Sequence, residues 1–190
     1  MAAATAVLTA HGLVLHVLAY APGVSFSVRA FLASCRDLPH LGLAPTELDM
    51  ACRLGYLPLV LKLKDRPCTT KAMDWAAANG HLHVVQYLHG HRSEGCTVDA
   101  IDRAAQNGHL DVVRFLTTQR HEGYTANAMV WAAVHGHVDV LMALHDTNSS
   151  CEWNHDYALN RAIANGHEHV GNWVQSVFVH PRPSQNPEML

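Results

Sequence analysis

The chain contains few charged residues and no excess of basic ones. Charged side chains make up 15% of its 190 residues, and 13 Lys and Arg against 16 Asp and Glu give a formal net charge of -3. Proteins that bind nucleic acid or an anionic membrane through their charge need a basic surface, so both classes of partner are disfavoured. Hydrophobic residues make up 49% of the chain, which is typical of a folded globular protein.

The sequence also lacks a long apolar run and paired cysteines. No run reaches the roughly 18 apolar residues that a membrane span requires. The five cysteines are an odd number without a C-x-x-C pair, which disfavours a disulfide framework and favours a reducing, cytoplasmic setting. The apolar stretch 1–23 precedes the first basic residue, Arg29. A secretory signal begins with a basic region, so we expect a folded helix there, with a signal peptide as the alternative.

Signatures of catalysis are absent as well. The sequence has no G-x-x-x-x-G-K-[ST], no G-x-G-x-x-G and no G-x-S-x-G. Asp49, Asp74 and Asp102 each stand six residues before a glycine. A carboxylate in the first turn of a helix is favoured by the helix dipole, and this explanation is preferred over paired-carboxylate catalysis. We therefore expect no enzyme, no catalytic residue and no cofactor.

The sequence does contain an internal repeat. Four segments align without gaps, and a fifth at 47–63 aligns with more divergence; the four are AMDWAAANGHLHVVQYL (72–88), AIDRAAQNGHLDVVRFL (100–116), AMVWAAVHGHVDVLMAL (128–144) and ALNRAIANGHEHVGNWV (158–174). The shared glycines, Gly55, Gly80, Gly108, Gly136 and Gly166, are separated by 25, 28, 28 and 30 residues. Such periodicity is typical of solenoid proteins.

Each unit reads as two short helices. Before the glycine, small apolar residues such as Ala76 and Ala77 recur at helical spacing, and after it Leu82, Val85 and Leu88 form a second apolar face. The glycine ends the first helix because it adopts a positive φ without strain. In the connectors, Thr97 and Thr125 are candidates to cap the next helix. Two such helices cannot bury their apolar faces alone, so the units must stack on one another.

Sixteen histidines are the most unusual feature of the composition. Four of them directly follow the shared glycine, namely His81, His109, His137 and His167. Several belong to H-x-H pairs, whose side chains point to different sides of a helix and chelate poorly. We expect these histidines to pack between repeats, with a zinc site as a remote alternative. Those near the connectors, among them His89 and His155, are expected at the solvated surface.

The pattern A-x-x-x-A-A-x-x-G-H-x-x-V-V-x-x-L, intact in 72–88 and 100–116, resembles the ankyrin repeat. The family's T-P-L-H signature is absent, and the steps are shorter than the usual ~33 residues, so the projecting hairpin fingers must be trimmed. The resemblance implies an all-α solenoid of helical hairpins, about five ankyrin-like repeats with an N-terminal helical cap. We expect the repeat domain to span 46–179 and residues 180–190 to form a disordered tail.

Residues 1–45 carry two interpretations. Their apolar stretches read as an N-terminal cap or as a degenerate segment resembling an F-box, although the usual Leu-Pro-x-Glu opening is missing. An F-box would make the protein a substrate adaptor of an SCF-type ubiquitin ligase. The preferred function is a monomeric interaction module, which binds a protein partner of unknown identity on the concave face of the solenoid.

The ankyrin resemblance also implies where a partner would bind. In such repeats the position just before the paired small residues faces the concave groove. Here these positions are Met50, Trp75, Arg103, Trp131 and Arg161, and Trp and Arg are enriched among binding hot spots. The alternative is that Trp75 and Trp131 fill space between successive helices. An unpaired guanidinium would not be accepted at an equivalent core position, which favours the surface interpretation.

Overall fold

The computed structural model describes residues 46–147 and 152–179, and both ranges are helical without any strand. The expected N-terminal cap or F-box-like segment and the expected tail lie outside the described residues. Each repeat contributes a first and a second helix. The first helices are α3 (Glu47–Leu54), α5 (Lys71–Ala78), α7 (Val98–Gln106), α9 (Ala126–Val134) and α11 (His155–Ala164). The second helices are α4 (Leu57–Lys62), α6 (Leu82–His91), α8 (Leu110–Gln119), α10 (Val138–Asp146) and α12 (Glu168–Val174), which continues into the π-helix η1 (Gln175–Val179).

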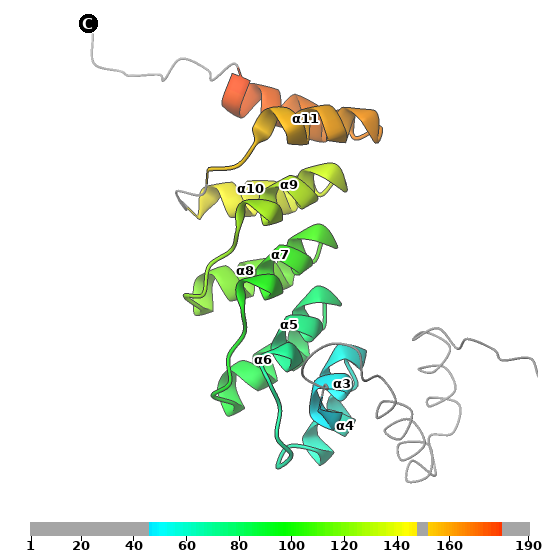
Figure 1. The fold of residues 1–190 in the computed structure, drawn as a ribbon, viewed down its shortest axis with the longest axis vertical. Coiled ribbons are helices and arrows are strands. Elements are labelled where there is room, and N and C mark those ends of the chain that lie inside the picture. The colour runs from blue at the N-terminus through cyan, green and yellow to red at the C-terminus, as the bar shows by residue number, and fades with distance from the viewer. Residues whose placement is uncertain (1–45, 148–151, 180–190) are drawn as a thin grey trace, which may run out of the picture.

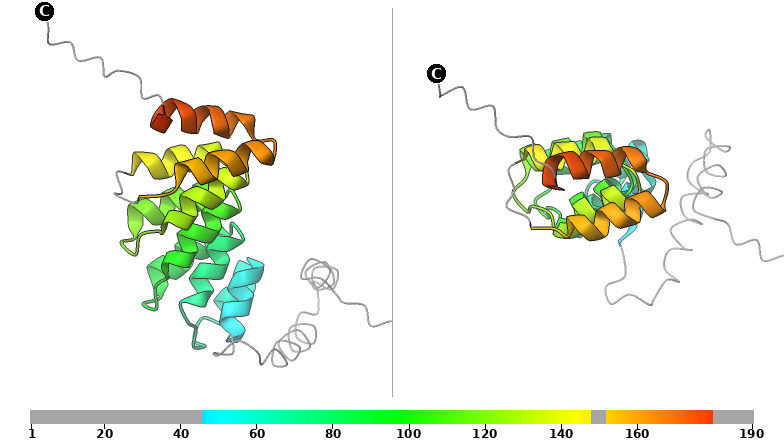
Figure 2. Two further views of the ribbon diagram at one scale, coloured as in Figure 1. Left: turned by 45° about the horizontal axis from the view of Figure 1, so that its top comes forward. Right: turned by 90° about the horizontal axis from the view of Figure 1, so that it is seen from above.

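The five helix pairs stack in chain order into an elongated array (Figure 1). Each first helix packs on the first helices of its neighbours, and the second helices form a parallel layer behind them, as Figure 2 shows from above. The described chain is therefore an all-α solenoid, as the repeat predicted. Its core is a continuous row of buried alanines, valines and leucines that runs between the two layers.

Threonine side chains start two of the first helices, as predicted. Thr97 Oγ1 accepts a hydrogen bond from the backbone N–H of Asp99 at 3.2 Å, and Thr125 Oγ1 accepts one from that of Asn127 at 3.1 Å. Each bond satisfies one of the N–H groups that lack a partner within the helix. The cap fixes where each connector ends and the next repeat begins.

The histidine that follows each shared glycine lies on the glycine of the preceding repeat. A Cβ atom on Gly55 would come within 2.4 Å of His81 Nδ1. The same contact recurs between His109 and Gly80, His137 and Gly108, and His167 and Gly136. Any larger residue at these glycines would collide with the ring, in addition to the strain of its positive φ. The glycine therefore ends a helix and also receives the next repeat.

These histidines also bond to the preceding first helix. His81 Nε2 donates to the carbonyl of Arg53 at 3.1 Å. His109 bonds in the same way to Ala78, and His137 to Gln106. The carbonyls belong to the last helical turn, which has no further N–H groups of its own to pair with. Burial lowers the pKa of His81, His109 and His137, and the hydrogen bonds to the backbone oppose it only in part.

Three buried carboxylates join successive first helices. Asp74 accepts hydrogen bonds from the N–H of Thr97 at 2.8 Å and from its hydroxyl at 3.0 Å. Asp49 pairs in the same way with Thr69, and Asp102 with Thr125. Attraction to the helix dipole does not predict these hydrogen bonds, because each threonine partner lies on the connector after the helix. We call these three pairs the Asp–Thr bonds.

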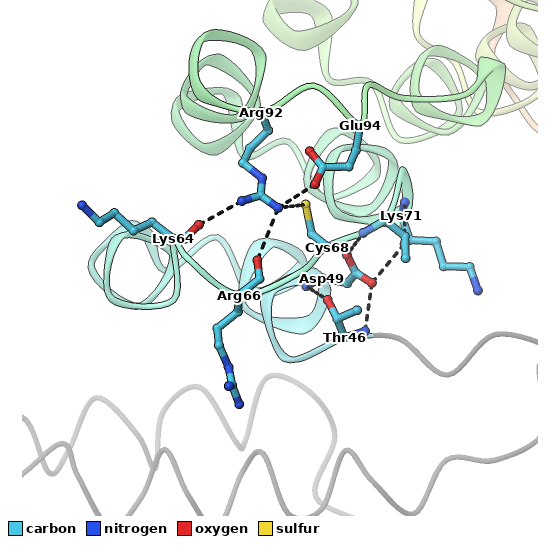
Figure 3. A network of polar contacts seen from close by, with 9 residues as sticks. Thr46, Asp49, Lys64, Arg66, Cys68, Lys71, Arg92 and Glu94 are labelled. Carbon is cyan, nitrogen blue, oxygen red and sulfur yellow. Dashed lines mark hydrogen bonds and ion pairs between the residues drawn. The ribbon is translucent and has the colours of Figure 1, made fainter.

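Arginine and glutamate hold the connectors together. The Arg92 guanidinium donates to Glu94 at 2.6 Å, to the carbonyl of Lys64 at 2.9 Å and to the sulfur of Cys68 at 3.3 Å (Figure 3). Arg120 forms the equivalent ion pair with Glu122. The R-x-E-G pattern therefore marks a connector whose arginine contacts the connector of the preceding repeat.

Aromatic side chains pack the last repeat. Val130 on α9 stands where the earlier repeats have aspartate, so the junction between α9 and α11 lacks an Asp–Thr bond. Trp153 is buried and meets Phe178 edge-on, with ring centroids 5.4 Å apart. His155 stacks on Phe178 at 4.8 Å. The expectation that His155 is solvated surface is wrong, because its ring is half-buried in this cluster.

Candidate partner-binding surface

Four of the five predicted binding residues form a row along the first helices. Trp75, Arg103, Trp131 and Arg161 occupy equivalent positions of α5, α7, α9 and α11. The residue after each of them is a fully buried alanine, and the list is Ala76, Ala104, Ala132 and Ala162. The four side chains therefore lie where the packed face of each helix gives way to its exposed face. We call them the Trp–Arg line.

Exposure differs along this row. Arg103 and Arg161 are exposed, with 52% of the Arg103 side chain accessible, whereas Trp75 and Trp131 are half-buried. Both tryptophans thus combine packing against the array with an accessible part. Met50, the equivalent residue of α3, is only 7% exposed and offers a partner little area.

Two basic side chains flank Trp75. The Arg53 guanidinium carbon lies 5.5 Å from the centre of the Trp75 ring, and the Lys71 ammonium lies 6.0 Å from it. Both distances are within the range of cation–π attraction. Arg53 reaches the ring from the last turn of α3, one repeat earlier. Sequence reasoning missed both residues, although Lys71 stands one helical turn before Trp75.

Within the described part of the chain, the ion pair of Arg103 is with an exposed carboxylate. The Arg103 Nε lies 3.7 Å from Asp99 Oδ2, one turn earlier on α7, and 58% of the Asp99 side chain is accessible. Exposed pairs of this kind contribute about 0–1 kcal/mol. The Arg103 guanidinium can therefore exchange this pairing for one with a partner at little cost.

Among the described residues, the possible metal ligands are dispersed and three cysteine thiols have raised pKa values. Within 46–147 and 152–179, no three His, Cys, Asp or Glu side chains come together as a metal site would require. Burial raises the pKa of Cys52 and of Cys96 to about 12 and also raises that of Cys68, so these thiols stay protonated at neutral pH. In the same ranges, every helix is too short or too polar to cross a membrane.

Comparison with known proteins is consistent with this fold. A family model described as ankyrin repeats (many copies) matches residues 73–117. No curated protein matches the sequence. Among solved structures, a crystal structure of the yeast ribosomal protein Rps3 in complex with its chaperone Yar1 is similar, with 19% identity and a TM-score of 0.35. That match covers 66% of this chain and 87% of the other.

The matched residues comprise most of α5, all of α6 and α7, and most of α8, the part of the chain where the repeat pattern is intact. The same helix pair and glycine recur on both sides of it, and the histidine after the glycine recurs on its C-terminal side. The family match confirms the resemblance at residues 73–117, and the described ranges 46–147 and 152–179 consist of helical repeats similar to these.

Proposed function

We propose that the protein is an interaction module whose protein partner binds the exposed face of the first helices, along the Trp–Arg line. Ankyrin repeats are a protein-interaction fold, and the described residues hold no cluster of side chains that could bind a metal ion. The chain would act by presenting a rigid surface, because stacked repeats fix the relative positions of side chains on successive helices.

One observation carries the choice of surface. At equivalent positions the packed side chains hardly change from repeat to repeat, whereas the Trp–Arg line alternates between tryptophan and arginine. Packing between repeats does not explain this alternation, since the exposed guanidinium groups of Arg103 and Arg161 fill no space in the core. Tryptophan and arginine are the residue types that most often dominate binding energy.

The first prediction tests this surface. Replacing Trp75 and Trp131 with alanine should reduce capture of the native partner at least about tenfold, because two half-exposed aromatic anchors are lost. The measurement is quantitative proximity labelling in the native cell, comparing wild type, the double variant and Met142→Ala. Met142 is 47% exposed on the second helix α10, so its variant is the matched control and should keep full capture.

A second variant guards against loss of fold. Arg103→Ala with Arg161→Ala removes exposed side chains and should change stability by less than about 0.5 kcal/mol, which a thermal melt checks. If both double variants remain folded and keep their labelled partners at wild-type levels, the Trp–Arg line is not the binding surface.

A further inference from the structure

We infer that the segment bound by the Trp–Arg line is an acidic, extended stretch of the partner protein, with carboxylates spaced to meet Arg103 and Arg161. This inference rests on the proposed function and adds the chemistry of the partner. Its basis is the charge around the row, the absence of competing acceptors and the distance between equivalent positions.

The exposed face around the row is basic although the chain as a whole is acidic. The positions three and four residues before and after each member of the row lie on the same helix face. The charged ones among them are Lys71 and Asp99, which balance each other. Arg103 and Arg161 belong to the row itself, and Arg53 lies over Trp75. Glu47 stands three residues before Met50 as Arg53 stands three residues after it, so this face carries a surplus of two positive charges on a chain with a net charge of -3.

The opposite layer carries the opposite sign. The exposed charged side chains of the second helices are Lys62, Asp111, Arg114, Asp139, Asp146 and Glu168, four acidic residues against two basic residues. An acidic segment would be attracted to the first helices and repelled from the second helices. The distribution of charge therefore favours an acidic partner segment and favours its binding to the first helices.

Acidic groups of the first helices do not compete for these arginines. Asp49, Asp74 and Asp102 are buried and accept hydrogen bonds from threonines. Glu47 pairs with Arg66 at 3.0 Å, and Asp156 stands five residues before Arg161, off its helix face. The contact of Asp99 with Arg103 is long and exposed. The guanidinium groups of the row can therefore form bidentate pairs with carboxylates from a partner.

The spacing of the row defines the spacing of the carboxylates. Packed helices lie about 8–10 Å apart, so Arg103 and Arg161, two helices apart, are separated by roughly 16–20 Å along the array. An extended chain advances about 3.3 Å per residue, which places the two carboxylates roughly five or six residues apart. A residue midway between them would lie over Trp131, where an apolar or aromatic side chain fits.

Nucleic acid fits this surface less well. The phosphates of a nucleic acid require a dense basic surface. Here the basic residues alternate with tryptophans, and the protein as a whole has a negative net charge. Acidic side chains at wide intervals match separated arginines better than a continuous row of phosphates does.

The second prediction is tested by selecting peptides on the intact protein. The probe is a phage-displayed library of random 16-residue peptides, selected on the immobilised full chain at low salt. Soluble fluorescent copies of the selected peptides are then titrated by polarisation. Selected peptides should be rich in Asp and Glu and poor in Lys and Arg. Arg103→Glu with Arg161→Glu should weaken their binding roughly tenfold, and Arg114→Glu on α8, the matched control, should leave binding unchanged.

Other outcomes separate the two proposals. Peptides that are neutral or basic, yet lose affinity in the Trp75→Ala/Trp131→Ala variant, overturn the acidic partner and leave the binding surface standing. Acidic peptides that bind all variants equally well contradict both proposals. An empty selection overturns the inference, because the library contains acidic sequences of the required spacing. A 16-nucleotide single-stranded DNA that binds more tightly than the selected peptides, and loses affinity in the arginine variant, overturns it in favour of nucleic acid.

Discussion

At the scale of single residues, the contact between a histidine and the glycine of the preceding repeat sets the distance between helix pairs. Gly108 and Gly123 have nearly the same positive φ, 76° and 75°. A Cβ on Gly108 would lie 2.6 Å from His137 Nδ1, whereas no atom of the described residues lies within 4 Å of a Cβ on Gly123. The two glycines therefore separate the cost of the backbone conformation from the cost of the contact.

The third prediction uses this pair. Gly123→Ala should destabilise by about 1–2 kcal/mol, the cost of a positive φ for a residue with a Cβ. Gly108→Ala should cost at least about 1 kcal/mol more, because the His137 ring must also move. Urea unfolding monitored by circular dichroism measures both. Equal losses of stability would show that the ring moves aside freely and that the contact does not set the spacing.

At the scale of elements, the Asp–Thr bonds connect the first helices α3, α5 and α7 to the start of the next first helix. The Asp102 carboxylate accepts from the Thr125 N–H at 2.9 Å and also from its hydroxyl, while Thr125 caps α9. A buried acceptor that serves two donors is costly to remove, since both donors lose their partner.

The fourth prediction concerns this bond. Asp102→Ala should destabilise the protein by about 2–3 kcal/mol, and Asp102→Asn by less, because the amide oxygen still accepts one bond. Asp99→Ala is the matched control on the same helix, and this exposed residue should cost less than about 0.5 kcal/mol. Chemical denaturation of the three variants provides the comparison. A loss at Asp102 no larger than that at Asp99 would show that the bond contributes nothing to stability.

These elements also show what the sequence reveals and what it leaves hidden. Helix pairs, glycine ends and threonine caps were predictable, because each depends on residues close together in the chain. The recurrence of Asp49, Asp74 and Asp102 was visible too, but their threonine partners lie 20 to 23 residues further on, across a stacked junction. The position of Arg53 over Trp75 was hidden for the same reason. Contacts between repeats follow from how the units stack, which a repeat pattern does not specify.

At the scale of the whole molecule, the histidines between repeats link stability to pH. Burial lowers the pKa of His81, His109 and His137 below the ordinary value of 6.5. As the pH falls, the histidines of the unfolded chain therefore bind protons at a higher pH than those of the folded protein. The stabilisation is complete above about pH 6.5 and is lost as the pH drops toward the folded-state values. Neighbouring rings act in the same direction, since His83 lowers the pKa of His81 and His135 that of His137.

The fifth prediction follows from this linkage. The melting temperature should fall by about 2–4 °C between pH 7.5 and pH 5.5, as measured by differential scanning calorimetry. Burial raises the pKa of Asp74 and Asp102 from 3.8, which acts in the opposite direction. His109→Gln should flatten the dependence, while His121→Gln, at an exposed connector residue, should not. A melting temperature constant over this range would contradict the linkage.

The glycine–histidine contact also gives the array a direction. Each repeat after the first carries a histidine that fits the repeat before it, and each of the first four carries a glycine that accepts the repeat after it. Among the described residues nothing lies within 4 Å of a Cβ on Gly166, the last of these glycines. A tandem duplication of one 28-residue unit, such as the step from Gly80 to Gly108, would copy both halves of the contact together. The lengthened chain would need no compensating substitution at either new junction. A gene encoding such a protein can therefore gain or lose whole repeats in single events while every remaining junction keeps its fit.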